Sequence, residues 1–262
     1  MTASEKSPCP DCGEQYKQIA THWRKSKCSP PPLPTSDRET VVGCLLAGGM
    51  LRQGSHSRQA FLEYNTTFRK NVKWLQSRLG YIGAHGTVYT HDRERGTSYR
   101  LRTITHPDLY GFNSIQEPGE SAVRLPTATD IEGSYEWDRT GSAIELTASA
   151  ARTWYALSGS LYQRVSPPIP ELRGRNTAAA ENEWKDLLEP FSPRVYSDRI
   201  RLQDAVTWFD FIRWEPPSTE SPPWLSEEEV KQGTRCPDCG KYYTQVKLHW
   251  AQSTCTSDNE SS

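Results

Sequence analysis

The sequence predicts an α+β protein whose central part repeats one order of helices and strands and carries a small cysteine-rich module at each end. Three observations lead to this prediction. One cysteine and histidine pattern occurs near both termini, proline-rich stretches separate these patterns from the centre, and helical and strand-like segments alternate twice between them. The 262 residues suffice for one large domain or two modest ones plus appendages.

The two terminal modules share one spacing. They read CPDCGEQYKQIATHWRKSKC and CPDCGKYYTQVKLHWAQSTC, and 11 of their 20 positions are identical. A Cys-x-x-Cys turn presents two thiolates to one ion, and a histidine and a third cysteine complete the closed shell typical of structural zinc. We therefore expect two structural Zn²⁺ sites, with the ligands Cys9, Cys12, His22 and Cys28 in the first and Cys236, Cys239, His249 and Cys255 in the second.

Both modules resemble C2HC-type zinc fingers, which are normally unfolded without their metal. Contact with nucleic acid and a staple or protein contact are both open roles for them. The first module carries Lys17, Arg24, Lys25 and Lys27, which suit phosphate, whereas the second has fewer cations.

Two linkers bound the central body. The stretch at 29–36 reads SPPPLPTS, which predicts a stiff extended spacer, and a Pro- and Ser-rich stretch precedes the second module. The expected division is a zinc finger at 1–28, a linker at 29–36, a first repeat at 37–125, a connection at 126–146, a second repeat at 147–215, a linker at 216–235, and a zinc finger with a tail at 236–262.

The first half of the body begins with the apolar stretch 41–51, which follows a capping box of Ser36 and Glu39 and predicts a helix. A strand is expected at 60–64, and Thr66 or Thr67 then caps a second helix. That helix places apolar residues at helical spacing, namely Phe68, Val72, Leu75 and Leu79. Two strands at 87–91 and 99–105, with Gly96 in the turn between them, complete this half.

The second half repeats this order. A helix is expected from Thr147 through 159, and a strand at 172–176 follows. The next helix, from about residue 178, carries an apolar face of Trp184, Leu187, Leu188 and Phe191. A strand at 199–202 and a last helix at 204–212 close the half.

The order and spacing of three segments resemble the LAGLIDADG homing endonuclease family in its single-chain, two-repeat form. The segments are VVGCLLAGGML at 41–51, THPDLYGF at 105–112 and LTASAARTWYALSGSL at 146–161. The resemblance covers about residues 37–213 and implies two pseudosymmetric αββαββα repeats with saddle-shaped sheets, in a monomer with an internal pseudo-twofold axis. It also implies that the two motif helices pack closely through small residues, which are Gly43 and Ala47 on one and Ala151 or Ala156 on the other.

The resemblance also implies a catalytic departure. In active members of the family, an acidic residue near the end of each motif helix holds Mg²⁺, a hard cation that takes oxygen ligands. Gly48 and Ser158 stand at these positions. Since neither is an anion, we expect no catalytic residues of the family type and a cleavage-deficient protein.

The family binds duplex DNA with the concave faces of its sheets, and arginines follow the corresponding strands here as i, i+2 pairs. In a strand this spacing places both side chains on one face. Arginine suits both phosphate and guanine edges. The expected DNA-binding residues are Arg93, Arg95, Arg100, Arg102, Arg173, Arg175, Arg199 and Arg201.

These features predict a DNA-binding protein derived from a homing endonuclease. Three alternatives stay open: an active endonuclease with relocated ligands, which would need Mg²⁺, a zinc-stapled protein-interaction scaffold, and an RNA-binding maturase. The net charge of −1 excludes a uniformly basic surface, so a polyanion site requires local clustering. No signal peptide is visible, and the apolar run at 41–51 is shorter than the roughly 20 residues of a membrane span, so we expect a cytoplasmic, nucleoid-associated protein without membrane contact.

Overall fold

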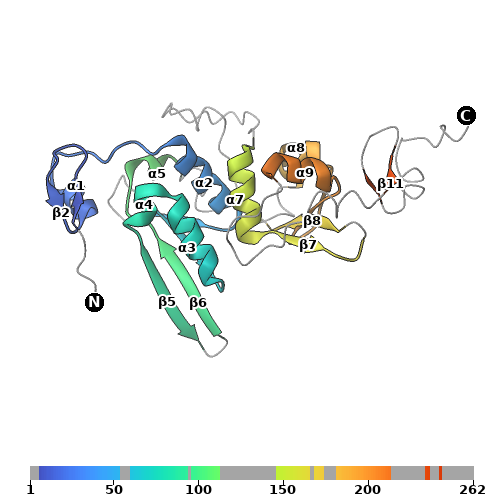
Figure 1. Cartoon of the computed structure of the whole chain (residues 1–262), viewed down its shortest axis with the longest axis horizontal. Helices are drawn as coiled ribbons and strands as arrows, with labels where there is room; N and C mark the ends of the chain where they lie inside the picture. The colour runs from blue at the N-terminus through green and yellow to red at the C-terminus, as the bar shows by residue number, and fades with distance from the viewer. Residues whose placement is uncertain are drawn as a thin grey trace, which may run out of the picture.

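The computed structural model of the chain shows a row of units, with the N-terminal module at one end and two α+β halves beside each other (Figure 1). It describes residues 6–53, 60–93, 96–112, 146–165, 168–173, 181–213, 234–236 and 242–243. No helix among these residues has the length and apolar character needed to cross a membrane.

The N-terminal module is a small ββα unit. Strand β1 (Ser7–Pro8) pairs antiparallel with β2 (Gln15–Tyr16), and α1 (Ile19–Lys25) follows. Near the other end of the chain, β11 (Thr234–Arg235) pairs with β12 (Tyr242–Tyr243), which are the described elements of the second module.

The first half contains an antiparallel four-stranded sheet in the order β3-β4-β6-β5. Its elements in chain order are α2 (Thr35–Leu46), β3 (Met50–Gln53), β4 (Ala60–Thr66), α3 (Arg69–Arg78), α4 (Gly80–Ala84), β5 (Thr87–Arg93), β6 (Gly96–Arg102) and α5 (Pro107–Gly111).

The second half has the same topology, with the strand order β7-β8-β10-β9. Its elements are α7 (Ala148–Ser158), β7 (Ser160–Tyr162), β8 (Ile169–Leu172), α8 (Glu181–Leu187), the 3₁₀ helix η2 (Glu189–Phe191), β9 (Pro193–Val195), β10 (Ile200–Leu202) and α9 (Ala205–Ile212). The predicted α+β fold with two αββαββα repeats is therefore confirmed.

Helices α2 and α7 lie side by side at the centre of the molecule (Figure 1). A Cβ atom at Gly43 would overlap the carbonyl oxygen of Ala150 and lie 2.6 Å from Cβ of Thr153. The backbones can approach this closely only because Gly43 has no side chain. The expected close packing is confirmed at Gly43, but its nearest partners are Ala150 and Thr153 and not the predicted Ala151 or Ala156.

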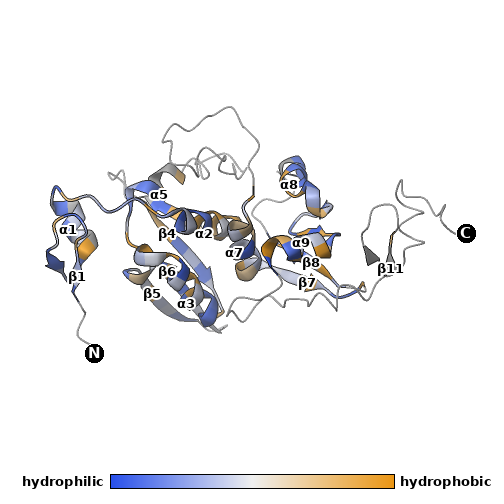
Figure 2. Ribbon diagram, turned by 45° about the horizontal axis from the view of Figure 1, so that its top comes forward, coloured by the Kyte–Doolittle hydropathy of each residue, from blue (hydrophilic) through white to orange (hydrophobic). Residues whose placement is uncertain are grey.

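One hydrophobic core spans both halves, and its residues come from α2, α7, α9 and the inner faces of both sheets. Hydrophobic residues are visible on α2, α7 and α9 in Figure 2. In α2 every residue from Val41 to Leu46 is buried, as expected for a helix enclosed on all sides. In the second half Tyr155 packs edge-on against Trp208 and Phe209.

The predicted boundaries of the first motif helix are wrong. Helix α2 begins at Thr35, directly after Pro34, and no side chain caps it, so the capping box of Ser36 and Glu39 does not form. The helix ends at Leu46, because Gly48 adopts a φ of +96° that turns the chain into β3. The stretch 41–51 is therefore part helix and part strand.

The observed bounds of the other helices and strands differ less from the predicted ones. Strand β8 ends at Leu172, where the expected strand at 172–176 begins. The short strands β7 and β9 are not predicted, since three residues carry too little alternation. The expected cap of the second helix is wrong, because α3 begins after Phe68 and neither Thr66 nor Thr67 caps it. Thr147 caps α7, since its side chain accepts a hydrogen bond from the backbone N–H of Ala150.

The N-terminal module packs against the first half. Trp23 of α1 is buried and meets Tyr81 of α4 edge-to-face, with ring centroids 5.8 Å apart. Tyr81 and Ile104 extend the module's own core of Cys9, Ile19 and Trp23. The module is therefore in direct contact with the body.

The segment between the module and α2 is also fixed to the body. The Tyr81 hydroxyl donates to the carbonyl of Pro31 over 2.7 Å, and the backbone N–H of Leu33 donates to Asp108 over 2.8 Å. Nε2 of buried His106 lies 3.0 Å from the same Pro31 carbonyl, while Nδ1 accepts from the Asp108 backbone. Burial lowers the pKa of His106, so it is a neutral structural donor.

Gly43→Ala tests the central helix contact. In an ordinary helix interior this change stabilises by about 1 kcal/mol. Because the new methyl group meets Ala150 and Thr153, we expect the free energy of unfolding to fall by about 1–3 kcal/mol in urea titrations. Lys73→Ala on the exposed side of α3 is the control and should change it by less than about 0.5 kcal/mol. Unchanged or raised stability of Gly43→Ala would show that the two helices do not meet there.

Candidate functional site

The ends of α2 and α7 form the first part of the site, and we call positions 48 and 158 the helix tips. At the first tip Gly48 offers no side chain, and the space around a Cβ atom built there is empty to 4 Å. At the second tip the Ser158 hydroxyl is within hydrogen-bond distance of two carbonyls, 3.3 Å from Trp154 O and 3.0 Å from Arg173 O. Glycine has no ligand atom and the serine oxygen is neutral, so these residues do not fit a magnesium ion.

Hydrogen bonds between elements fix the second helix tip. The Tyr64 hydroxyl, from β4 of the first half, donates to the carbonyl of Leu157 over 3.0 Å. Burial raises the pKa of Tyr64, which keeps this hydroxyl protonated. The indole N–H of Trp154 donates to the Arg173 carbonyl over 2.8 Å, beside the Ser158 contact. The tip therefore serves to join α7 to β4 and to the end of β8.

A glutamate occupies equivalent positions in the two sheets. Two residues beyond each tip the chain enters the edge strand, at Met50 in the first half and at Ser160 in the second. Met50 lies opposite Glu63 of β4, and Ser160 lies opposite Glu171 of β8. The two glutamates thus have the same place in the repeat.

Each glutamate also lies opposite an arginine on its other side. Arg102 of β6 pairs with Glu63, and Arg201 of β10 pairs with Glu171. Residues directly opposite in a sheet point to the same face. Leu62, Leu101 and other alternating residues face the core, so these glutamates and arginines lie on the outer faces of the two sheets.

On the first outer face, Arg100 binds two residues of β4. Its Nε donates to Oδ1 of Asn65 over 3.0 Å, and Nη1 lies 3.8 Å from Oε2 of Glu63. The guanidinium carbon of Arg102 lies 3.9 Å above the centre of the Phe61 ring. Tyr89, opposite Arg100 in β5, is 40% exposed and adds an aromatic surface to this face.

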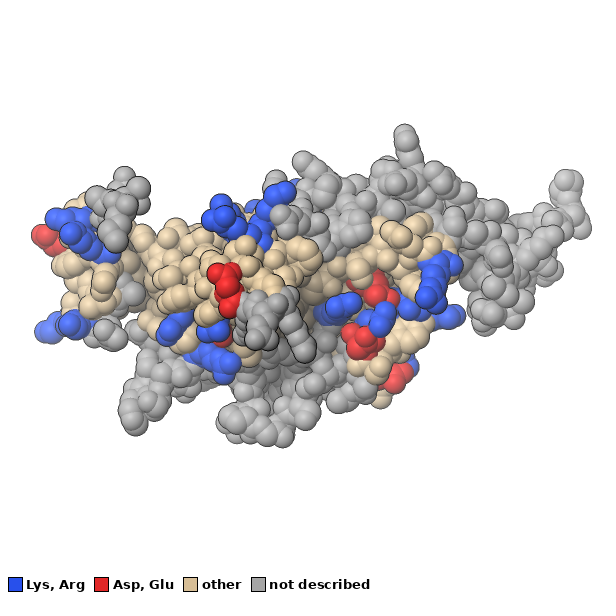
Figure 3. Space-filling model, turned by 90° about the horizontal axis from the view of Figure 1, so that it is seen from below, with Lys and Arg blue, Asp and Glu red and all other residues tan. Residues whose placement is uncertain are grey.

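On the second outer face, Glu171 binds two arginines. Nε of Arg201 donates to Oε2 over 3.0 Å, and Nη1 of Arg199 lies 3.5 Å from Oε1. The Arg201 guanidinium lies over the rings of Tyr162 and Tyr196, at 3.6 and 4.6 Å from their centres. Figure 3 shows basic side chains over both halves on the side seen from below, with acidic ones among them.

Of the other four predicted DNA-binding residues, the structure describes two. Arg173 is exposed and follows β8, and Arg93 ends β5 opposite Gly96. Arg95 and Arg175 lie outside the described residues. Sequence reasoning missed Glu171 and the role of Glu63, and it missed the rings of Phe61, Tyr162 and Tyr196. Only the strand register, which no pattern in the sequence fixes here, reveals that the two glutamates are equivalent.

The N-terminal module brings its predicted ligands together. The ligand atoms of Cys9, Cys12, His22 and Cys28 all lie within 4.8 Å of one another, and Cys12 Sγ is 3.6 Å from His22 Nε2. Three thiolates and one imidazole are a donor set that suits zinc. In the part of the chain that the structure describes, this is the only cluster of three or more such residues that could hold a metal.

Two cysteine pKa values in this cluster diverge. Burial raises the pKa of Cys9, but hydrogen bonds from the backbone N–H groups of Cys12 and Asp11 outweigh it and bring the value to about 6. A hydrogen bond with Ser26 lowers the pKa of Cys28, but burial and the neighbouring Cys12 side chain raise it to about 11. A bound cation would favour the thiolate form of these cysteines.

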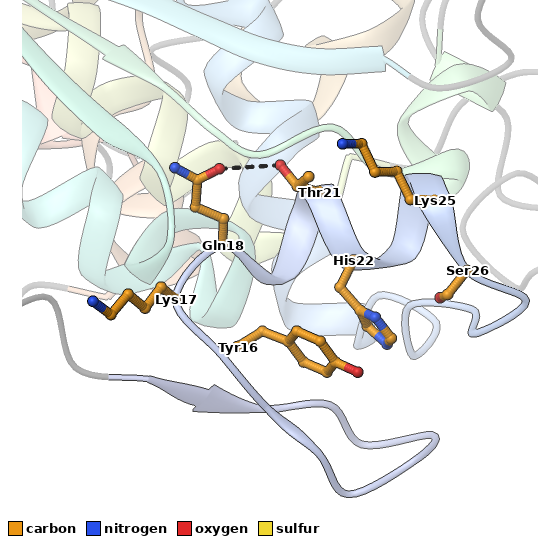
Figure 4. A pocket seen from close by; sticks show the side chains of 7 residues that line it. All are labelled: Tyr16, Lys17, Gln18, Thr21, His22, Lys25 and Ser26. Atoms are coloured by element: carbon orange, nitrogen blue, oxygen red, sulfur yellow. Dashed lines mark hydrogen bonds between the residues drawn. The ribbon is translucent and has the colours of Figure 1, made fainter.

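A shallow groove of about 530 Å³ lies beside α1. Figure 4 shows the rings of Tyr16 and His22 side by side, and their centroids are 3.7 Å apart. Lys17 and Lys25 flank the groove, and both are exposed.

The second module is described only in part. Cys236 is buried beside β11, whereas Cys239, His249 and Cys255 lie outside the described residues. Its zinc site stays a prediction.

Comparisons with known proteins find the likeness in structure and not in sequence. No protein-family model and no curated protein matches the chain. The solved structure of the homing endonuclease I-WcaI bound to its DNA recognition sequence matches with a TM-score of 0.53 and 11% identity, over 76% of this chain and 88% of that one. The structure of I-DmoI in complex with DNA and manganese matches with a TM-score of 0.39 and 12% identity, over 70% of this chain and 100% of that one. The I-WcaI match shows that the chain has the fold of a homing endonuclease.

Proposed function

We propose that the chain binds duplex DNA on the outer faces of its two sheets and does not cleave it by the two-acid mechanism of homing endonucleases. The observation that carries this proposal is the absence of a carboxylate at both helix tips. The central helix pair is kept, but Gly48 and Ser158 supply no carboxylate to it. The I-WcaI structure, which shares the fold, holds DNA.

The outer faces support DNA as the partner. Arg100 and Arg102 in the first half correspond in register to Arg199 and Arg201 in the second. Strands that carry arginines can enter the major groove of B-DNA, whereas the deep, narrow major groove of RNA excludes them. Duplex DNA is therefore favoured over RNA. Because both repeats belong to one chain, we further propose that the protein is a monomer. We also propose that it is located in the cytoplasm at the nucleoid.

The alternative of an active enzyme with relocated ligands has two candidate carboxylates, Glu63 and Glu171. Both already face arginines, and Glu171 accepts hydrogen bonds at both oxygens. An arginine pair neutralises a carboxylate and competes with a cation for it. These contacts favour binding over cleavage.

We propose that the N-terminal cluster holds a structural zinc ion and that the C-terminal module holds a second. A closed shell of four protein ligands leaves no position for substrate. Since Trp23 of the module contacts Tyr81 of the body, zinc at Cys9, Cys12, His22 and Cys28 would fix the module to the first half.

The arginine prediction concerns a variant with Arg100, Arg102, Arg199 and Arg201 changed to alanine. Each phosphate contact contributes about 0.9 to the slope of log affinity against log salt. We expect binding to random duplex DNA to weaken at least tenfold in gel-shift titrations, with a salt slope reduced by about 0.9 for each of these arginines that contacts a phosphate.

The matched control removes the same number of cations from the exposed side of α3: Arg69, Lys70, Lys73 and Arg78. This helix packs on the inner face of the first sheet, so its variant should keep most of the affinity. Equal retention of DNA by both variants and the unsubstituted chain would favour the protein-interaction scaffold.

The cleavage prediction uses a supercoiled plasmid that carries a sequence selected by the protein from random duplexes. With Mg²⁺ or Mn²⁺ we expect nicked and linear forms to stay at the level seen with chelator, because the tips supply no anion to hold the ion. Metal-dependent linearisation that chelator abolishes would establish the active alternative.

The zinc prediction compares Cys28→Ser with Cys44→Ala in the full chain. Loss of a ligand at Cys28 should lower the zinc content by one ion per chain in elemental analysis, and it should lower the melting temperature because the module is packed on the body. Cys44 is buried in α2 outside the cluster, so Cys44→Ala should keep all its zinc. Equal zinc content in the two variants would refute the first site.

A further inference from the structure

Each outer face carries a carboxylate, which is unexpected on a surface proposed to bind an anion. Glu171 is 5% exposed although it lies on an outer face. Both of its oxygens accept hydrogen bonds, Oε2 from Arg201 and Oε1 from Arg199 and from Ser160. A negative charge placed here weakens attraction to phosphate, so its presence calls for a separate reason.

The contacts of Arg201 supply that reason. Glu171 accepts from Nε, which is the nitrogen nearest the side-chain stem, and the guanidinium plane lies over Tyr162 and Tyr196. Nη1 also lies 3.4 Å from the Tyr196 hydroxyl. An arginine side chain has many rotamers and loses this freedom when it binds, so a side chain already fixed loses less. The carboxylate and the two rings therefore hold one orientation of Arg201.

The first half repeats the arrangement with different details. Glu63 occupies the equivalent position and lies 3.8 Å from Arg100, whose Nε donates to Asn65. Arg102 is held over Phe61. The two halves thus share the carboxylate and the arginine pair, while the aromatic partners come from different strands.

We propose that Glu63 and Glu171 are positioning residues that make DNA recognition selective, each for the half of the target under its own sheet. This inference rests on the proposed function. A fixed arginine distinguishes guanine from other bases through its two-pronged hydrogen bonding, whereas a mobile arginine binds any nearby phosphate. The carboxylate also disfavours purely electrostatic binding, which makes wrong sequences weaker partners.

The experiment uses Glu171→Gln and Glu63→Gln in the full chain. Glutamine keeps the size and an acceptor oxygen but removes the charge. Affinity for random duplexes should rise about threefold, with a salt slope steeper by about one unit because one more cation faces phosphate. The preference for the selected target over random duplexes should fall about tenfold.

The position of the effect separates positioning from general damage. Selection from random duplexes should show that each variant relaxes base preference in one half of the target, and that the two variants relax opposite halves. Glu181→Gln is the matched control, because Glu181 pairs with Lys185 on α8 and is half-exposed. It should leave the preference and the slope unchanged.

The outcomes distinguish this inference from the proposed function. If the unsubstituted chain binds a preferred sequence and both glutamine variants keep the whole preference, the inference is wrong and the function stands. A uniform loss of preference across both halves in either variant also overturns it. If the unsubstituted chain retains no duplex DNA, both fail. Circular dichroism melting of each variant identifies loss of folding, and Glu63→Gln, whose ion pair is longer, provides the test where Glu171→Gln unfolds.

Discussion

The contact between α2 and α7 determines the arrangement of the rest of the molecule. Gly43 sits against the backbone of Ala150 and the side chain of Thr153, and no larger residue fits there without movement. This contact joins the two halves into one core and sets both helix ends beside their sheets. The direction of each sheet, and therefore of its outer arginines, follows from it.

The ends of α2 and α7 are built without charged side chains. A catalytic pair of acids would place two buried like charges close together, which is costly without a cation. In this chain Gly48 allows a turn, and the Ser158 hydroxyl contacts the carbonyl at the end of β8. Gly48 thus serves the turn into β3, and Ser158 serves the contact between α7 and the end of β8. The outer faces keep charged groups in which carboxylates and arginines balance each other, consistent with the small net charge of the chain.

Much of the fold could be predicted from the sequence, because the repeat order rests on apolar spacing, as at the buried Val72, Leu75 and Leu79. The helix caps could not, because no side chain caps α2 or α3, whereas Thr147 and Asp204 cap α7 and α9. The end of α2 could not, since an apolar run looks the same in a helix and in a buried strand, and the turn at Gly48 lies inside it. The cysteine spacing predicted which four residues gather in the first module. The docking of that module through Trp23 and Tyr81, like the equivalence of Glu63 and Glu171, depends on contacts between distant segments that a single sequence does not reveal.

The most direct test is a crystal structure of the full chain with its selected duplex in the presence of Mn²⁺, with anomalous scattering used to locate the metal. We expect an intact duplex across the outer faces of both sheets and no manganese at the helix tips. Manganese held beside Gly48 and Ser158 by Glu63 or Glu171, with both DNA strands cut, would contradict it.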